Sequence, residues 1–173
     1  IEKLADRGAV QVPIIQHPDV KRMLLKMKAY VEGLRSLILY VAWCFDKEKI
    51  CQAEEEVRKY KNLIGILTPV VKSYASEKGF DVCVEAMQVF GGYGYTQEYP
   101  VEQMVRDCKI ASIYEGANGI QAMDFLGRKL TQGKGAALEA LVNEMRIIIQ
   151  KAKDKKRLES LAQKLEKAVG LLD

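Results

Sequence analysis

The sequence is organised around residues 88–121, which read QVFGGYGYTQEYPVEQMVRDCKIASIYEGANGIQ. Two glycine-rich corners, Gly91–Gly94 and Gly116–Gly119, lie on either side of a short segment with helical character. Glycine lets the backbone enter conformations closed to other residues and lets a ligand approach the main chain closely. Outside this stretch the apolar residues recur at helical spacing, so we expect helices that lead into and out of the two corners.

The segment before the first corner predicts two long helices. One apolar stripe steps by four and three residues from Val20 to Phe45, which is typical of a helix packed in a bundle, and this helix is expected to end near Asp46–Lys49. A second helix is expected to begin near Ala53 and to continue to the first corner. Pro69 should kink it without stopping it, because the apolar stripe keeps its phase there.

The segment after the first corner predicts shorter helices. One covers Val101–Ile113, and the next begins at the corner with Glu115 and Gly116. Two further apolar stripes predict an antiparallel pair of helices that turns near Asp154–Lys156. The stripes consist of Leu138, Leu141, Met145, Ile148 and Ala152 on one helix, and of Leu158, Leu161, Leu165 and Leu172 on the other.

The fold class that follows is all-α, because no segment alternates apolar and polar residues long enough to predict a strand. We expect an up-and-down four-helix-type bundle over residues 1–132 and additional C-terminal helices over residues 133–173. The chain opens within a charged, helix-like phrase, so we expect it to be a piece of a longer protein.

Composition narrows the functional classes. The 173 residues are 49% apolar, as in globular proteins, and no apolar run is long enough to cross a bilayer. The net charge is +4, and its basic excess lies mainly in residues 151–157, where a solvated helix end is favoured over a nucleic-acid surface. The four cysteines form no Cys-x-x-Cys pair and have no histidine partner beyond His17, so we expect free thiols and no metal site.

The first corner has two interpretations. It follows a helix and lacks the spacing of a Rossmann or P-loop turn, so the residues favour a helix C-cap with a left-handed glycine. The alternative is a backbone platform for a phosphate or ribose, in which Gln88 and Phe90 supply an amide and an apolar wall.

Glu115, beside the second corner, is the candidate for chemistry. A glutamate near a helix start has a structural explanation, since it complements the positive end of the helix dipole. Its neighbours Ile113 and Tyr114 are apolar or aromatic, and Gly116 clears space beside it. A carboxylate in such surroundings loses solvation and becomes a stronger base. From the residues alone, function stays open between a ligand site and a bundle interface.

In combination, the central residues resemble the C-terminal α-helical domain of acyl-CoA dehydrogenases. The matching elements are Gln88-Val-Phe-Gly-Gly-x-Gly, Glu98-Tyr99-Pro100-Val101-Glu102, Arg106-Asp107, and Ile113-Tyr114-Glu115-Gly116-x-x-x-Ile120-Gln121. The resemblance runs from about residue 1 to residue 128. The last helices resemble an extension found in larger members of the family.

The resemblance implies a flavin-dependent reaction. In the family a glutamate removes the α-proton of an acyl-CoA thioester while the β-hydride passes to FAD, which is bound between subunits. The matching glutamate is Glu115, and Tyr114 and Gly116 would contact the substrate. The FAD contacts that the resemblance implies are Arg7, His17, Gln88, Phe90, Gly91, Gly92, Ala117, Asn118 and Gly119.

The resemblance further implies an electron-transfer flavoprotein as electron acceptor, a homo-oligomer (dimer or tetramer), and a bacterial cytoplasmic or mitochondrial matrix location. Ala117 replaces a usual threonine, which removes one hydroxyl from the expected FAD site. The chain is expected to be inactive by itself, because the family's other domains are missing from it. The alternatives are an acyl-CoA oxidase on the same scaffold and a non-catalytic helical oligomerisation module.

Overall fold

A computed structural model of the protein describes residue 8 and residues 10–172. This part of the chain is helical and contains no strand, so the predicted all-α class is confirmed. The elements are η2 (Ile14–Gln16), α1 (Pro18–Ile50), α2 (Glu54–Phe90), η3 (Gly91–Tyr95), α3 (Val101–Ile110), α4 (Asn118–Asp124), the π-helical turn η4 (Phe125–Lys129), η5 (Gln132–Gly135), α5 (Ala136–Lys153) and α6 (Glu159–Val169).

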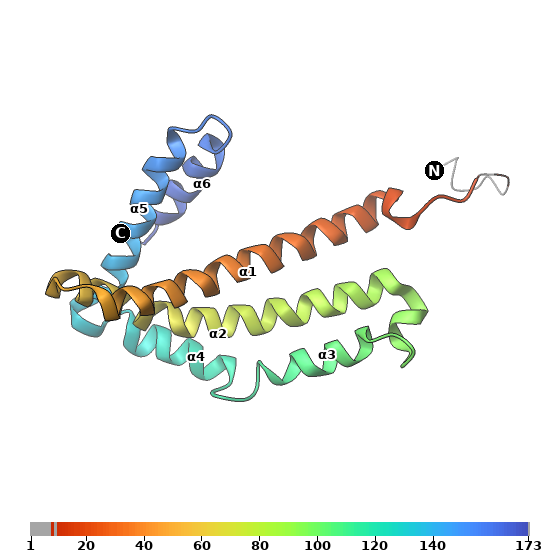
Figure 1. Ribbon diagram of the computed structural model, residues 1–173, viewed down its shortest axis with the longest axis horizontal. Coiled ribbons are helices and arrows are strands. Elements are labelled where there is room, and N and C mark those ends of the chain that lie inside the picture. Colours follow the sequence, from red (N-terminus) through yellow and green to blue (C-terminus); the bar gives the residue numbers. More distant parts are fainter. Residues whose placement is uncertain (1–7, 9, 173) are drawn as a thin grey trace.

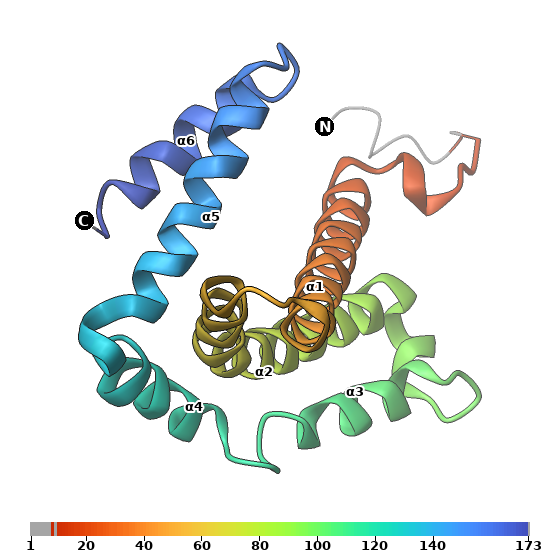
Figure 2. The same cartoon turned by 60° about the vertical axis from the view of Figure 1, so that its left-hand side comes forward.

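The two long helices α1 and α2 run antiparallel and form the body of the molecule (Figure 1). Along its other side α2 packs against α3 and α4, which follow one another along the helix. Viewed more nearly along the long helices, α3 and α4 curve around α2 (Figure 2). The α5–α6 hairpin projects from the end of the body where α1 ends and α2 begins. Helix α2 is therefore the element against which α1, α3, α4 and α5 all pack.

Proline stands at the start of α1 and glycine at the end of α2, as the sequence predicted. Pro18 occupies the first turn of α1, where its missing N–H costs nothing. Pro69 is buried inside α2, and the helix continues through it. Gly65 stands one turn before Pro69, and the Thr68 hydroxyl donates to the Ile64 carbonyl oxygen at 2.7 Å. Helix α2 then ends at the first glycine corner.

The buried side chains form small clusters along the helices. On α2, Leu63 and Ile66 are completely buried against α1 and α5. One cluster, of Val41, Ile66, Leu67 and Ala137, joins α1 and α2 to α5, and a second, of Val142, Ile149, Ala162 and Val169, holds α5 to α6.

The predicted apolar stripes are only partly the buried faces. On α1, Val31, Ile38 and Phe45 were expected inside but are 44%, 46% and 44% exposed. Leu34 and Val41 of the predicted stripe are buried on α1, and the other two buried positions, Met23 and Cys44, lie outside the stripe. In the hairpin, the predicted Ile148 and Leu161 are exposed, and Ile149 and Ala162 take the inner positions. Apolar residues occupy two adjacent faces of these helices, so periodicity alone cannot decide which face a partner helix covers.

Candidate functional site

The second glycine corner is a tight turn between α3 and α4. Helix α3 ends at Ile110, three residues before its predicted end, because the chain tightens into turns in which the amides of Ile113 and Tyr114 both bond the Ile110 carbonyl. Helix α4 begins at Asn118, within the Gly116–Gly119 corner and three residues later than the predicted start at Glu115. Beyond Tyr114 the chain leaves this helical bonding pattern, so Glu115 and Gly116 can hold special backbone angles.

Glu115 has such an angle. Its φ is 54°, and among the described residues only Lys134 shares a positive φ without being glycine. Left-handed backbone costs a residue with a Cβ about 1–2 kcal/mol. Gly116 follows with a φ of 86°, and a Cβ there would lie 2.7 Å from Gln121 Nε2. The turn therefore needs glycine at position 116 and holds a strained glutamate at position 115.

One side chain and one backbone amide hold the turn. The amide of Gln121 donates to the carbonyl oxygens of Glu115 and Gly116, at 3.5 and 3.3 Å. The backbone N–H of Asn118 donates to the Ser112 carbonyl at 3.2 Å and closes the turn across its base. Strained backbone persists only where its surroundings enforce it, and such positions cluster at functional sites.

Asn118 also ties the turn to α2. Its Oδ1 accepts hydrogen bonds from Lys72 Nζ at 3.2 Å and from Ser76 Oγ at 3.0 Å. Its Nδ2 donates to the Ser73 carbonyl and to Glu77 Oε1, both at 3.3 Å. An asparagine side chain offers two acceptor positions and two donor hydrogens, so all four are used.

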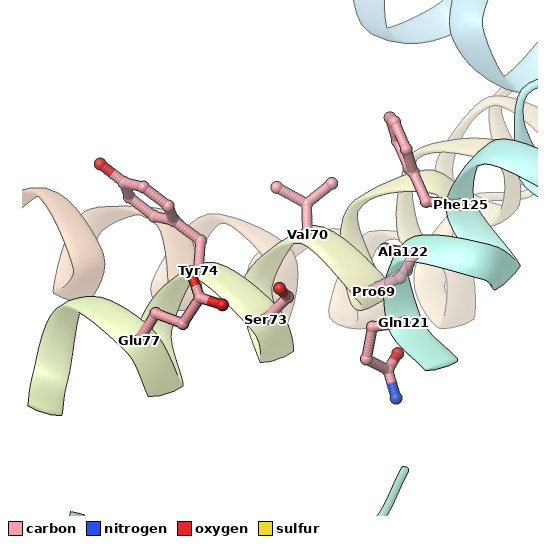
Figure 3. A pocket seen from close by; sticks show the side chains of 8 residues that line it. All are labelled: Pro69, Val70, Ser73, Tyr74, Glu77, Gln121, Ala122 and Phe125. Carbon is pink, nitrogen blue, oxygen red and sulfur yellow. The ribbon is translucent and has the colours of Figure 1, made fainter. Parts of the chain in front are cut away.

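A small cavity of about 240 Å³ lies beside the turn, between α2 and α4. Figure 3 shows its lining side chains on two neighbouring helical segments. Ligand pockets typically enclose about 300–1,000 Å³, so this cavity is too small to hold a drug-sized ligand by itself. Its lining residues are Pro69, Val70, Ser73, Tyr74, Glu77, Gln121, Ala122 and Phe125.

The side chain of Glu115 is exposed to solvent. Ile113 and Tyr114, which the sequence suggested as its apolar cover, are themselves 57% and 50% exposed. The prediction that these neighbours desolvate the carboxylate is therefore wrong for this chain by itself. Both side chains project outward because the turn places them on the surface, where they are available to another protein segment or to a ligand.

The first corner differs from the predicted left-handed cap. Gly91 caps α2 with φ 62° and ψ −144°, a region open essentially only to glycine. A Cβ on Gly91 or Gly92 would meet nothing within 4 Å, so the backbone is open to approach on that side. Phe90 is exposed, and its ring lies 5.9 Å from that of Tyr99. The corner therefore presents open backbone next to exposed aromatic rings.

The two corners lie at opposite ends of α3, whose 10 residues span about 15 Å. At one end, His17 directly precedes α1, whose first turns lie beside the late part of α2, where Arg22 and Lys26 both form ion pairs with Glu85. The structure thus groups the predicted residues into one set of His17, Gln88, Phe90, Gly91 and Gly92, and another of Tyr114, Glu115, Gly116, Ala117, Asn118 and Gly119. Arg7 lies outside the described residues.

The α2 side of the second corner was not predicted from the sequence. The partners of Asn118 are Lys72, Ser73, Ser76 and Glu77, and none of them stood out in the sequence. The available signal was their spacing, since positions i, i+1, i+4 and i+5 share one face of a helix. They form a polar patch beside the apolar stripe of α2.

Both corners lie in a stretch of the chain that matches the domain model of a known family. The acyl-CoA dehydrogenase C-terminal domain model matches residues 1–130, a range that contains both corners and the turn with Glu115. The chain belongs to the acyl-CoA dehydrogenase family. Within this acyl-CoA dehydrogenase chain, the matched range ends at Leu130, before the α5–α6 hairpin.

Two relatives of known name support the assignment. A broad-specificity linear acyl-CoA dehydrogenase of Mycobacterium tuberculosis is 37% identical over 171 residues, which are 98% of this chain and 28% of the relative. A butyryl-CoA dehydrogenase of Syntrophomonas wolfei is 39% identical over 144 residues, which are 83% of this chain and 24% of the relative. The chain therefore spans about a quarter of the length of these acyl-CoA dehydrogenases.

A solved structure, the apo form of Bd2924, resembles nearly the whole chain. The TM-score is 0.70 at 25% sequence identity, and the match covers 95% of this chain and 34% of that one. The arrangement of the helices is thus one that a solved protein shares.

Two further observations concern membrane-spanning helices and metal sites. Among the described residues, no helix combines the length and the apolar character that spanning a bilayer requires. The same part of the chain holds no group of three or more His, Cys, Asp or Glu side chains placed to bind a metal ion.

Proposed function

We propose that this chain is the C-terminal helical part of an FAD-dependent acyl-CoA dehydrogenase in which Glu115 is the catalytic base. The observation that carries the proposal is the strained backbone of Glu115, held by Gln121 and Asn118 at the position that matches the family's glutamate. In the reaction, the Glu115 carboxylate takes the α-proton of an acyl-CoA thioester. The β-hydrogen leaves with its electron pair, and a 2-enoyl-CoA remains. When bound, FAD accepts that hydride.

The exposure of Glu115 in this chain fits a site that other segments complete. A carboxylate is a stronger base when it is removed from water, and the exposed Ile113 and Tyr114 provide apolar surface for that purpose. Because this chain spans about a quarter of the length of its relatives, we propose that other parts of the enzyme and the bound thioester cover Glu115.

The first corner fits a flavin nucleotide. The open backbone of Gly91 and Gly92 allows close approach, and exposed Phe90 offers an apolar wall. Since this corner lies a helix length from Glu115, we propose that it contacts the FAD of a neighbouring subunit, together with Gln88, Arg7 and His17. Ala117 and Gly119 then contact the FAD beside Glu115.

A homo-oligomer follows from this division of the FAD site between subunits. The exposed apolar side chains of α1, among them Val31, Ile38 and Phe45, provide surface that an assembly can bury. On the family resemblance we further propose a saturated acyl-CoA substrate, an electron-transfer flavoprotein as electron acceptor, and a cytoplasmic or mitochondrial matrix location. The relatives named above, one for linear acyl-CoA and one for butyryl-CoA, support an unbranched acyl chain.

The proposal is tested on the flavin-loaded enzyme that contains this chain. Under anaerobic conditions, butyryl-CoA or a longer linear acyl-CoA should bleach the oxidised flavin absorbance and yield the 2-enoyl-CoA. Glu115→Gln should retain FAD and slow this reduction by about 10²–10⁴-fold, the usual contribution of a general base. Glu159→Gln, which alters an exposed carboxylate on α6, is the matched control and should behave as wild type.

Three results would count against the proposal. Normal flavin reduction by Glu115→Gln would exclude the residue as the base. Rapid reoxidation of the reduced flavin by oxygen would indicate an acyl-CoA oxidase. Absence of any flavin from the purified enzyme would indicate a non-catalytic assembly module.

A further inference from the structure

The geometry points to Asn118 as a positioning residue that fixes the turn carrying Glu115 to α2, and not as a contact to FAD. This inference rests on the proposed role of Glu115. It changes the part that the family resemblance implies for Asn118, since a side chain used to anchor the turn is not available to a cofactor.

The hydrogen bonds of Asn118 leave no capacity for a ligand. Its carbonyl oxygen already accepts from Lys72 and Ser76, and its amide nitrogen already donates to the Ser73 carbonyl and to Glu77. A cofactor contact would have to displace one of these partners. A half-satisfied polar network in a partly buried position loses stability, so displacement is unfavourable.

The charges around Asn118 also fix which way the amide faces. The Lys72 ammonium can only donate, so it requires the oxygen, and the Glu77 carboxylate can only accept, so it requires the nitrogen. Turning the amide over would place donors against Lys72 and an acceptor against Glu77. The orientation is therefore set by α2, and the start of α4 is held in one register against it.

This anchor reaches Glu115 through the turn itself. Asn118 is three residues beyond Glu115, and its backbone N–H closes the turn onto the Ser112 carbonyl. The Asn118 side chain thus fixes the later end of the turn to α2. The Asn118 backbone N–H ties the earlier end of the turn, at Ser112, to the same residue. Loss of the side-chain anchor would free the turn to relax the strained φ of Glu115 and move its carboxylate.

The test begins with Asn118→Asp, which keeps the shape of the side chain. The new carboxylate still accepts from Lys72 and Ser76 but cannot donate, and it faces the Glu77 carboxylate. We expect faster hydrogen exchange of the amides of residues 112–121. In the flavin-loaded enzyme we expect about 10²-fold slower flavin reduction, the effect of a misplacement of about 1 Å, with unchanged FAD affinity.

A second substitution separates anchoring from cofactor contact. Glu77→Gln added to Asn118→Asp supplies a donor to the new carboxylate and should restore slow exchange and most of the rate. If Asn118→Asp folds poorly, recovery of folding in the double variant assigns the defect to the contact with Glu77. Glu85→Gln is the matched control on α2, since Glu85 pairs with Arg22 and Lys26 of α1, and it should restore nothing.

Three outcomes overturn the inference. In the first, Asn118→Asp leaves the exchange of residues 112–121 unchanged. In the second, exchange quickens but flavin reduction does not slow. In the third, FAD affinity falls and Glu77→Gln does not restore it, which assigns Asn118 to the cofactor. Failure of the proposed function is seen separately, as normal activity of Glu115→Gln, because hydrogen exchange and its rescue report on the anchor without reference to turnover.

Discussion

Replacing Gly94 by alanine should destabilise the protein through a clash with the main chain. Gly94 is buried in η3, against the last turn of α2. A Cβ there would lie 2.7 Å from the Met87 carbonyl oxygen, 2.8 Å from Phe90 Cβ and 3.2 Å from Met87 Cα. Two of these atoms are backbone atoms of a helix, which cannot rotate away, so the first corner itself must shift.

The expected cost follows from this geometry. Overpacking of a tight site costs about 1–3 kcal/mol. For a chain of this length 1 kcal/mol corresponds to about 2–4 °C in Tm, so Gly94→Ala should lower Tm by about 2–12 °C. Because Phe90 and Met87 belong to the turn that precedes Gly91, the shift should also disturb the open backbone of the first corner.

Thermal unfolding followed by circular dichroism measures the effect against two glycine controls. At Gly92 a Cβ would meet nothing within 4 Å, so Gly92→Ala should change stability by less than about 0.5 kcal/mol. At Gly79, inside α2, a Cβ also meets nothing within 4 Å, so alanine should stabilise the helix by up to about 1 kcal/mol. A Gly94→Ala protein as stable as Gly92→Ala would refute the described packing of the corner.

Two predictions concern the hairpin and the thiols. In the hairpin, Ile149 is 2% exposed and Ile148 is 51% exposed. Ile149→Ala should therefore lower the stability of the hairpin by about 2–5 kcal/mol, and Ile148→Ala should lower it much less. Denaturant melts in which Ile148→Ala is the more destabilising change would contradict the structure. Burial and the neighbouring Cys108 thiol, 3.3 Å away, raise the pKa of Cys83 to about 12. Its thiolate fraction at pH 8 is then about 10⁻⁴, so alkylation monitored by peptide mass spectrometry should be about 10³-fold slower than in a free peptide and should accelerate as pH rises. Alkylation of Cys83 at the peptide rate would exclude the part-buried pair of thiols.

The helices were predictable because their limits depend on local chemistry. Pro18 fits a first helical turn, Gly91 ends α2, and the turn near Asp154–Lys156 separates α5 from α6 as expected. Which apolar face is covered was not predictable. Val31 and Ile149 each lie next to another apolar face of the same helix, and only the packing partner decides which face is buried.

The residues of the site could be predicted from the sequence, but their geometry could not. Gly116 beside Glu115 predicted a turn, and the motif of residues 113–121 indicated the family. The anchoring of Asn118 depends on Lys72 and Ser76 of α2, which lie more than 40 residues earlier in the chain. A contact of that separation leaves no local signal, and the exposure of Ile113 and Tyr114 depends equally on what packs against the turn.

The base assigned to Glu115 is tested most directly by hydrogen exchange at the α-carbon of the bound thioester. In deuterated water, the flavin-loaded enzyme should incorporate deuterium at the α-position of a bound acyl-CoA that is not oxidised, because the carboxylate removes and returns that proton. Glu115→Gln should bind the same acyl-CoA and lose this exchange by about 10²-fold or more. Equal deuterium incorporation by wild type and Glu115→Gln would contradict the assignment of Glu115 as the base.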